Sequence, residues 1–130
     1  HDGVNEHILV DLAIGGRTSK VLTRPERNGY VYILDRATGE VLSADPFVHI
    51  TASKGVGLKS GRLIPVKEKE PRLGVVVREI CPAAPGAKDW QPAAYSPRTG
   101  YVYMPHNNLC MDFEGVEANY IGRHTTGCRR

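Results

Sequence analysis

Short apolar runs, separated by turn-forming residues, dominate the first third of the chain. The runs are Ile8–Ile14, Lys20–Thr23, Tyr30–Leu34 and Glu40–Ala44. The first run ends at Gly15-Gly16, and the third follows Asn28-Gly29. Runs of this length and spacing are typical of strands joined by tight turns. The pattern predicts an antiparallel meander of four strands over residues 7–44.

The hairpin from Tyr30 to Ala44 is the clearest part of this pattern. In its connection, Asp35–Gly39, the Asp can accept backbone N–H bonds and the Gly can take a positive φ. Arg27 stands at the mouth of the turn that enters Tyr30. A cation at a strand end, beside a tight turn, is placed to face a ligand. This stretch alone nevertheless favours a solvated surface arginine.

A second set of runs indicates a second meander over most of residues 75–113. The runs are Val75–Ile80, Ala93–Tyr95, Tyr101–Met104 and Leu109–Phe113. Gly-Tyr-Val-Tyr occurs at 29–32 and again at 100–103, each time after a turn. We interpret this repeat as a repeated propeller blade. Two blades cannot close a ring, so we expect the chain to be part of a longer protein.

The stretches between and after these runs are less regular. Residues 45–74 are expected to form a long excursion, with a small hairpin over Gly57–Ile64 and a solvated face at Lys67–Glu70. Gly115–Tyr120 is expected to form one helical turn.

Composition narrows the class of protein. The 14 Gly and 9 Pro among 130 residues, together with short apolar runs, favour one all-β domain. The net charge is +3, and the three arginines after residue 122 account for the same number of positive charges. No basic cluster is interleaved with aromatics, which argues against a nucleic-acid surface. No run has the length of a membrane span.

Three stretches could carry chemistry. Cys81 and Cys110 lie in the same predicted blade, and either a disulfide or two buried thiols would suit them. Asp2 and Glu6 offer carboxylates before a strand, where they could hold a hard cation, although Asp2-Gly3 is also a turn signal. In the third stretch, Trp90 follows Asp89 in a loop. Such a pair suits a planar polar ligand, although a Trp that anchors the next blade is a common alternative.

Taken together, three segments resemble the methanol and ethanol dehydrogenases that use pyrroloquinoline quinone (PQQ), a family of quinoproteins. The segments are RPERNGYVYILDRATGEVLSA, REICPAAPGAKDWQPAAYSPRTG and PHNNLCMDFEGVEANY. The resemblance implies a fragment of an eight-bladed β-propeller, about two four-stranded blades. Residues 1–120 would form the partial propeller domain, and 121–130 an atypical tail. Asp35 and Thr38-Gly39 match the family's blade-docking motif, whose Trp is missing here.

The resemblance also implies roles for individual residues. Arg27 matches the arginine that contacts the quinone oxygens, where it would stabilise negative charge as hydride reaches the quinone. Asp89 matches an Asn or Asp that hydrogen-bonds the cofactor, and Trp90 follows it in many members. Cys81 and Cys110 match a structural disulfide, which requires their Cα atoms to lie roughly 4.4–6.8 Å apart.

Asp2 is implied as a metal ligand. The family's catalytic base is an Asp in a W-D-x-x-G-V-N context, and this chain begins directly after that Asp. Asp2 stands two positions after the base, where calcium-type members have Ala and lanthanide-dependent members have Asp. A trivalent ion attracts an added carboxylate more strongly than calcium does. The resemblance therefore implies a lanthanide, with calcium as the alternative.

The implied function is a periplasmic PQQ-dependent alcohol dehydrogenase. It would oxidise small primary alcohols by metal-assisted hydride transfer, pass electrons to a cytochrome c-type acceptor, and be compatible with a homodimer. The base and the stacking Trp lie outside this chain, so the segment alone is expected to be inactive. The alternative is a non-enzymatic propeller scaffold, which would not need Arg27, Asp89 and Asp2. A PQQ sugar dehydrogenase is disfavoured by CMDFEGVEANY.

Overall fold

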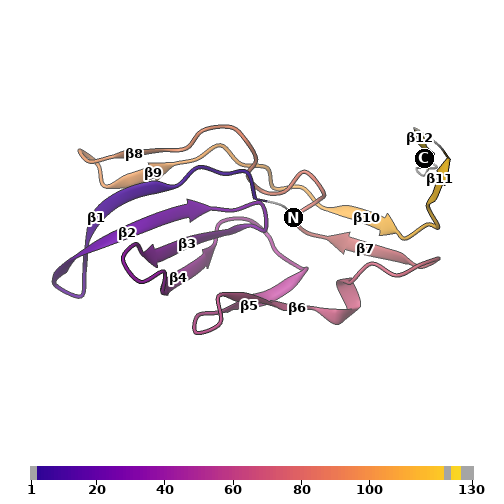
Figure 1. Ribbon diagram of the computed structural model, residues 1–130, viewed down its shortest axis with the longest axis horizontal. Helices are drawn as coiled ribbons and strands as arrows, with labels where there is room; N and C mark the ends of the chain where they lie inside the picture. Colours follow the sequence, from indigo (N-terminus) through magenta and orange to yellow (C-terminus); the bar gives the residue numbers. More distant parts are fainter. Residues whose placement is uncertain (1–2, 122–123, 127–130) are drawn as a thin grey trace.

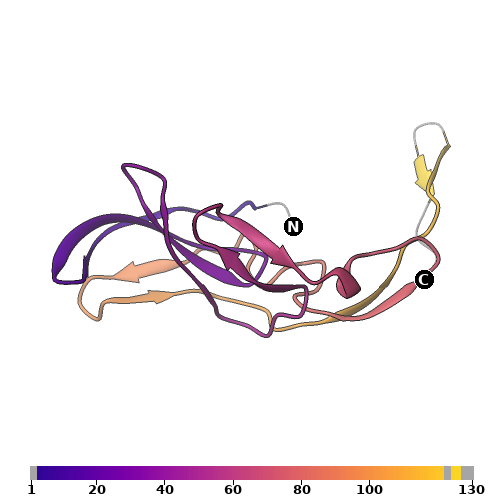
Figure 2. The same ribbon diagram turned by 90° about the horizontal axis from the view of Figure 1, so that it is seen from below.

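The computed structural model describes residues 3–121 and 124–126, an elongated arrangement of small antiparallel sheets (Figures 1 and 2). The strands are β1 (Ile8–Ile14), β2 (Arg17–Pro25), β3 (Tyr30–Asp35), β4 (Val41–Pro46), β5 (Ser53–Gly57), β6 (Arg62–Pro65), β7 (Val76–Ile80), β8 (Ala94–Ser96), β9 (Tyr101–Tyr103), β10 (Met111–Glu114), β11 (Asn119–Ile121) and β12 (His124–Thr126). A 3-10 helix, η1, spans Lys67–Lys69. Within residues 3–121 and 124–126, no helix is long and apolar enough to cross a membrane.

The predicted first meander is confirmed. Strands β1 to β4 form one antiparallel sheet in sequence order. β2 is longer than the apolar run Lys20–Thr23, because the Gly15-Gly16 turn lets Arg17 pair with Ile14 and Thr18 with Ala13. Along β2, Val21 and Thr23 are buried, whereas Lys20 is exposed, as expected for a strand with one covered face.

The Asp35–Gly39 connection also forms as its residues predict. The Asp35 carboxylate accepts the Ala37 N–H at 2.8 Å and the Thr38 N–H at 2.9 Å. These bonds, from Thr38 and then Ala37, hold the pKa of Asp35 below its ordinary value. Gly39 closes the turn with φ +79°.

The prediction of a second four-stranded meander is wrong. β8 pairs with β9, but β7 pairs directly with β10 in a separate two-stranded sheet (Figure 1). The irregular loop 81–93 carries the chain away from β7 before β8 begins. A Cys81–Cys110 disulfide then joins the residue after β7 to the residue before β10, with Cα atoms 4.4 Å apart. This confirms the predicted disulfide.

Two smaller expectations have different outcomes. The hairpin expected at Gly57–Ile64 is present as β5 and β6, and it is longer, from Ser53 to Pro65. The prediction of a helical turn at Gly115–Tyr120 is wrong. Gly115 forms a parallel bridge with Leu73 and accepts the Gly74 N–H at 2.8 Å, and β11 begins at Asn119. Non-local backbone pairing thus overrides the local tendency of this stretch.

The buried core is small and links the first sheet to the loop after β7. Its apolar members are Val10, Val21, Tyr30, Val77, Ile80, Cys81, Ala83 and Ala87. Cys81, Ala83 and Ala87 belong to the loop 81–93, so this irregular stretch is partly buried. The loop is therefore held close to the turn between β2 and β3, where Arg27 lies.

Candidate functional site

Arg27 is presented by the tight turn that joins β2 to β3. The Glu26 N–H donates to the Tyr30 carbonyl at 2.9 Å, and the Gly29 N–H donates to the Glu26 carbonyl at 3.0 Å. Gly29 has φ +91°, a conformation that glycine adopts without strain. These bonds fix the backbone on both sides of Arg27, so the direction of its side chain is set by the sheet.

The structure brings Arg27 and Asp89 together. Arg27 Nη1 lies 3.7 Å from Asp89 Oδ1, and Nη2 donates to the carbonyl of Pro85 at 3.0 Å and of Ala84 at 3.3 Å. The Arg27 side chain is 20% exposed and that of Asp89 is 28% exposed. A cation and a carboxylate, each partly accessible, thus come from two loops that are far apart in the sequence.

Backbone contacts hold the loop 81–93 against Arg27. The Ala87 N–H donates to the Arg27 carbonyl at 2.8 Å, and the Asn107 N–H donates to the Ala87 carbonyl at 2.7 Å. Gly86 permits this approach, because a Cβ built there would lie 2.7 Å from Arg27 Cβ. The loop can wrap the arginine this closely only with glycine at that position.

A partly buried ion pair, Glu6–Lys88, lies directly beside Asp89, and sequence reasoning missed its role. The Lys88 side chain is completely buried, and its Nζ lies 3.0 Å from Glu6 Oε2. Lysine is almost never fully buried unless it is paired. The sequence predicts Glu6 only as a possible cation ligand and predicts no role for Lys88. The sole available signal was their position beside candidate site residues, because nothing local predicts burial of Lys88.

Glu6 is held in its charged form. Burial raises the pKa of Glu6, but hydrogen bonds from the Ala93 and Glu6 backbone N–H groups, together with the bond and the charge from Lys88, outweigh it and lower the pKa. The Ala93 N–H and Lys88 Nζ each bind a different Glu6 oxygen. The ionised carboxylate therefore connects the segment before β1 to the loop 81–93.

The two other predicted site residues are placed differently. Trp90 follows Asp89, and its side chain is 74% exposed, so the described part of the chain leaves most of the ring uncovered. Asp2 lies outside the described residues. The described residues contain no group of three or more His, Cys, Asp or Glu side chains that could hold a metal ion.

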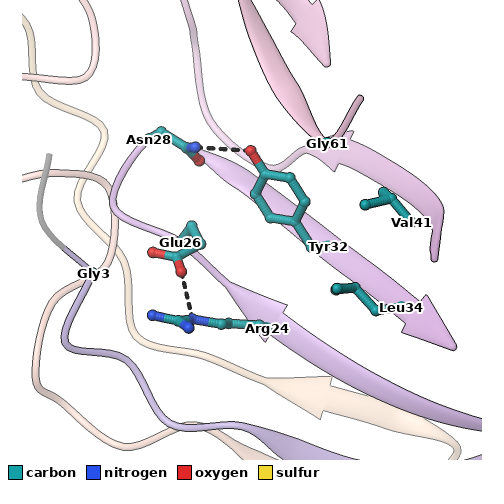
Figure 3. Close-up of a pocket in the computed structure, with 8 residues that line it drawn as sticks. All are labelled: Gly3, Arg24, Glu26, Asn28, Tyr32, Leu34, Val41 and Gly61. Carbon is teal, nitrogen blue, oxygen red and sulfur yellow. Dashed lines mark hydrogen bonds and ion pairs between the residues drawn. The ribbon is translucent and has the colours of Figure 1, made fainter. Parts of the chain in front are cut away.

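A cavity of about 470 Å³ lies beside the same turn and does not include Arg27 or Asp89 (Figure 3). It is lined by Gly3, Arg24, Glu26, Asn28, Tyr32, Leu34, Val41 and Gly61. Its polar groups are already paired: Arg24 with Glu26, and Asn28 Nδ2 with the Tyr32 hydroxyl at 2.9 Å. The Arg27–Asp89 pair has the more distinctive chemistry, so we take it as the candidate site.

Comparison with known proteins shows what this chain is similar to. No family model matches the chain. The lanthanide-dependent methanol dehydrogenase of Methylacidiphilum fumariolicum is 47% identical over 120 residues, 92% of this chain and 20% of that protein. The enzyme of the same name from Methylorubrum extorquens is 44% identical over 128 residues, 92% of this chain and 21% of that protein.

The same relationship is seen in three dimensions. A solved europium-containing methanol dehydrogenase superposes with a TM-score of 0.85 at 46% identity, over 91% of this chain and 20% of that one. The chain matches a segment of the quinoprotein alcohol dehydrogenases. It spans about one fifth of the length of the curated relatives it matches. The match and the antiparallel sheets confirm the expected fold, an all-β fragment of a β-propeller.

Proposed function

We propose that this chain is the segment of a PQQ-dependent alcohol dehydrogenase that contributes Arg27 and Asp89 to the cofactor site. The carrying observation is the 3.7 Å approach of these two side chains from distant parts of the sequence. The proposal is also supported by the 46% identity of this chain, over nine-tenths of its length, to a solved methanol dehydrogenase. The scaffold alternative gives no reason for a partly exposed Arg–Asp pair at this place.

The residues present fit a planar quinone that carries negative oxygens. The Arg27 guanidinium presents donors in a rigid plane, a geometry suited to binding negatively charged oxygens. Asp89 and the carbonyls of Ala84 and Pro85 surround that guanidinium and restrict its orientation. PQQ, when bound, supplies the two-electron oxidant for the alcohol. Arg27 then holds a fixed positive charge beside the position where negative charge develops.

We test this proposal in the full-length protein, recovered with its flanking coding sequence. Arg27→Lys keeps the charge but loses the planar set of donors, so kcat for a small primary alcohol should fall about a hundredfold. Arg36→Lys is the matched control, because Arg36 pairs with Asp11 at 3.1 Å away from this loop and should leave kcat unchanged. A full-length protein that binds no PQQ would instead favour the scaffold alternative.

For the metal, we propose a lanthanide ion, with calcium as the alternative, and Asp2 as one of its ligands. Two similar proteins are named lanthanide-dependent, and one solved relative is named for its europium. Oxygen ligands of high negative charge suit a trivalent ion. Asp2→Ala in the full-length protein should abolish activity with lanthanum. Equal lanthanum-supported activity in both forms would overturn this role of Asp2.

The remaining parts of the proposal concern the surroundings of the enzyme. We propose a small primary alcohol as the substrate and a cytochrome c-type electron acceptor. A relative from Methylobacterium organophilum is named methanol dehydrogenase [cytochrome c] subunit 1, which supports this choice. We further propose a periplasmic location and a homodimer for the intact enzyme. Fractionation and sizing of the full-length protein test these two points directly.

A further inference from the structure

We propose that the pair formed by Glu6 and the fully buried Lys88 is a positioning element that fixes Asp89 opposite Arg27 in the cofactor site. The inference rests on the proposed function and adds two residues to it. Neither side chain needs to touch the cofactor, because the pair acts through the backbone of the loop that carries Asp89.

Lys88 uses all of its hydrogen-bonding capacity on this loop and on Glu6. Its Nζ donates to Glu6 Oε2 at 3.0 Å, to the Asp89 carbonyl at 3.0 Å and to the Gln91 carbonyl at 2.7 Å. An ammonium group has three N–H donors, so each one is used. The two carbonyls flank Trp90, and binding both to one buried atom bends this part of the loop into a single conformation.

Glu6 ties the far end of the same loop to the segment before β1. One of its oxygens binds Lys88, and the other accepts the Ala93 N–H. Residues 86–93 contain no strand or helix, so regular secondary structure does not hold the backbone around Asp89 in place. The Glu6–Lys88 pair supplies bonds that a sheet would otherwise supply.

The neighbouring residue ties this segment to the other half of the site. Asn5 is buried, and its Nδ2 donates to the Pro25 carbonyl at 2.8 Å, two residues before Arg27. Asn5 thus binds the turn that carries Arg27, while Glu6 binds the loop that carries Asp89. The separation of Arg27 and Asp89 is set from both sides by two consecutive residues.

The experiment is a double-mutant cycle between Lys88 and Asp89 in the full-length protein, with PQQ affinity as the readout. Lys88→Met keeps a long side chain but removes every donor. Affinity is measured by titrating PQQ and following the absorption of the bound quinone, without any need for turnover. Lys69→Met is the matched control, because Lys69 Nζ also donates to a main-chain carbonyl, that of Arg78 in strand β7, at 2.8 Å.

If Lys88 acts through Asp89, Lys88→Met should weaken PQQ binding about tenfold, as loss of an outer-shell partner does at other sites. The same change in an Asp89→Ala background should alter affinity by no more than about twofold. Lys69→Met should leave affinity unchanged. If Lys88→Met does not fold, Glu6→Gln replaces it in the cycle, since it removes the charge and retains an acceptor.

Equal losses from Lys88→Met in both backgrounds would overturn the inference, because a merely structural residue acts independently of Asp89. Unchanged affinity in the single variant would overturn it as well. A wild-type protein that binds no PQQ would overturn the proposed function and this inference together. A wild type that binds PQQ leaves the proposed function standing whatever the cycle shows.

Discussion

At the scale of single residues, Gly86 decides how closely the loop 81–93 approaches Arg27. It has φ +84°, and a Cβ there would lie 2.7 Å from Arg27 Cβ and 3.1 Å from Arg27 Cα. Two separate costs therefore attach to any side chain at this position. One is the left-handed backbone conformation, and the other is displacement of the arginine.

Gly86→Ala and Gly100→Ala separate these two costs. Gly100 has φ +73°, but a Cβ there meets nothing within 4 Å, so its replacement should cost only about 1–2 kcal/mol of conformational strain. Gly86→Ala should destabilise the full-length protein more and also weaken PQQ binding, because Arg27 must shift. Urea unfolding and PQQ titration measure both effects. Equal losses of stability in the two variants would contradict the close contact.

Glu6 should make stability depend on acidity in a defined window. Its pKa is lowered from an ordinary value of 4.5, so the unfolded chain takes up its proton at a higher pH than the folded one. Its stabilising contribution is complete above the unfolded pKa and is lost as pH falls through the folded pKa. Urea midpoints between about pH 6 and pH 3 should therefore fall less steeply for Glu6→Gln than for wild type. Parallel curves would contradict the lowered pKa.

The sequence alone could predict only part of the candidate site. Arg27 and Asp89 could be predicted because each lies in a local motif, ERNG and KDWQP, which resembles the family pattern. The contact between Lys88 and Glu6 could not be predicted, because it joins residues 82 apart and depends on complete burial of a lysine. Local motifs carry no information on such a distant partner.

At the scale of elements, turn chemistry predicted the first sheet well. Asp35–Gly39 and Gly15-Gly16 determine where the strands reverse, and a reversal at a tight turn leaves one choice of neighbour. The second half lacks such a turn after β7. There the pairing of β7 with β10 is set by non-local contacts, including the disulfide, and strand propensity alone could not reveal it.

The disulfide should contribute substantially to the stability of this second sheet. It closes a loop with a sequence separation of 29 residues, which corresponds to roughly 3–4 kcal/mol in the chain-entropy model. Replacing both Cys81 and Cys110 with Ser avoids a stray thiol. This variant of the full-length protein should unfold at lower urea concentration. Wild type treated with reductant should match it, and an unchanged midpoint in both would argue against a stabilising role.

At the scale of the whole molecule, many large apolar side chains are uncovered. They include Trp90 at 74%, Leu73 at 67%, Tyr101 at 66% and Leu109 at 58% exposure. Exposed apolar surface of this kind marks contact with another structure. In the full-length protein we expect the neighbouring parts of the propeller to cover it.

The isolated chain of 130 residues should therefore behave poorly on its own. We expect it to oxidise no alcohol, to aggregate, and to bind hydrophobic dyes, since its sheet faces have no partner. Calorimetry of the purified chain checks this expectation. A sharp and reversible thermal transition would contradict it.

The Cys81–Cys110 disulfide also makes the chain tolerant of a cut between its two cysteines. Arg98 lies in the exposed turn between β8 and β9, inside the closed loop, whereas Lys59 lies in the exposed β5–β6 turn outside it. Exposed turns are preferred sites of proteolysis. After limited digestion with trypsin, the pieces on either side of Arg98 should migrate together on a denaturing gel until reductant is added. Pieces on either side of Lys59 should separate at once.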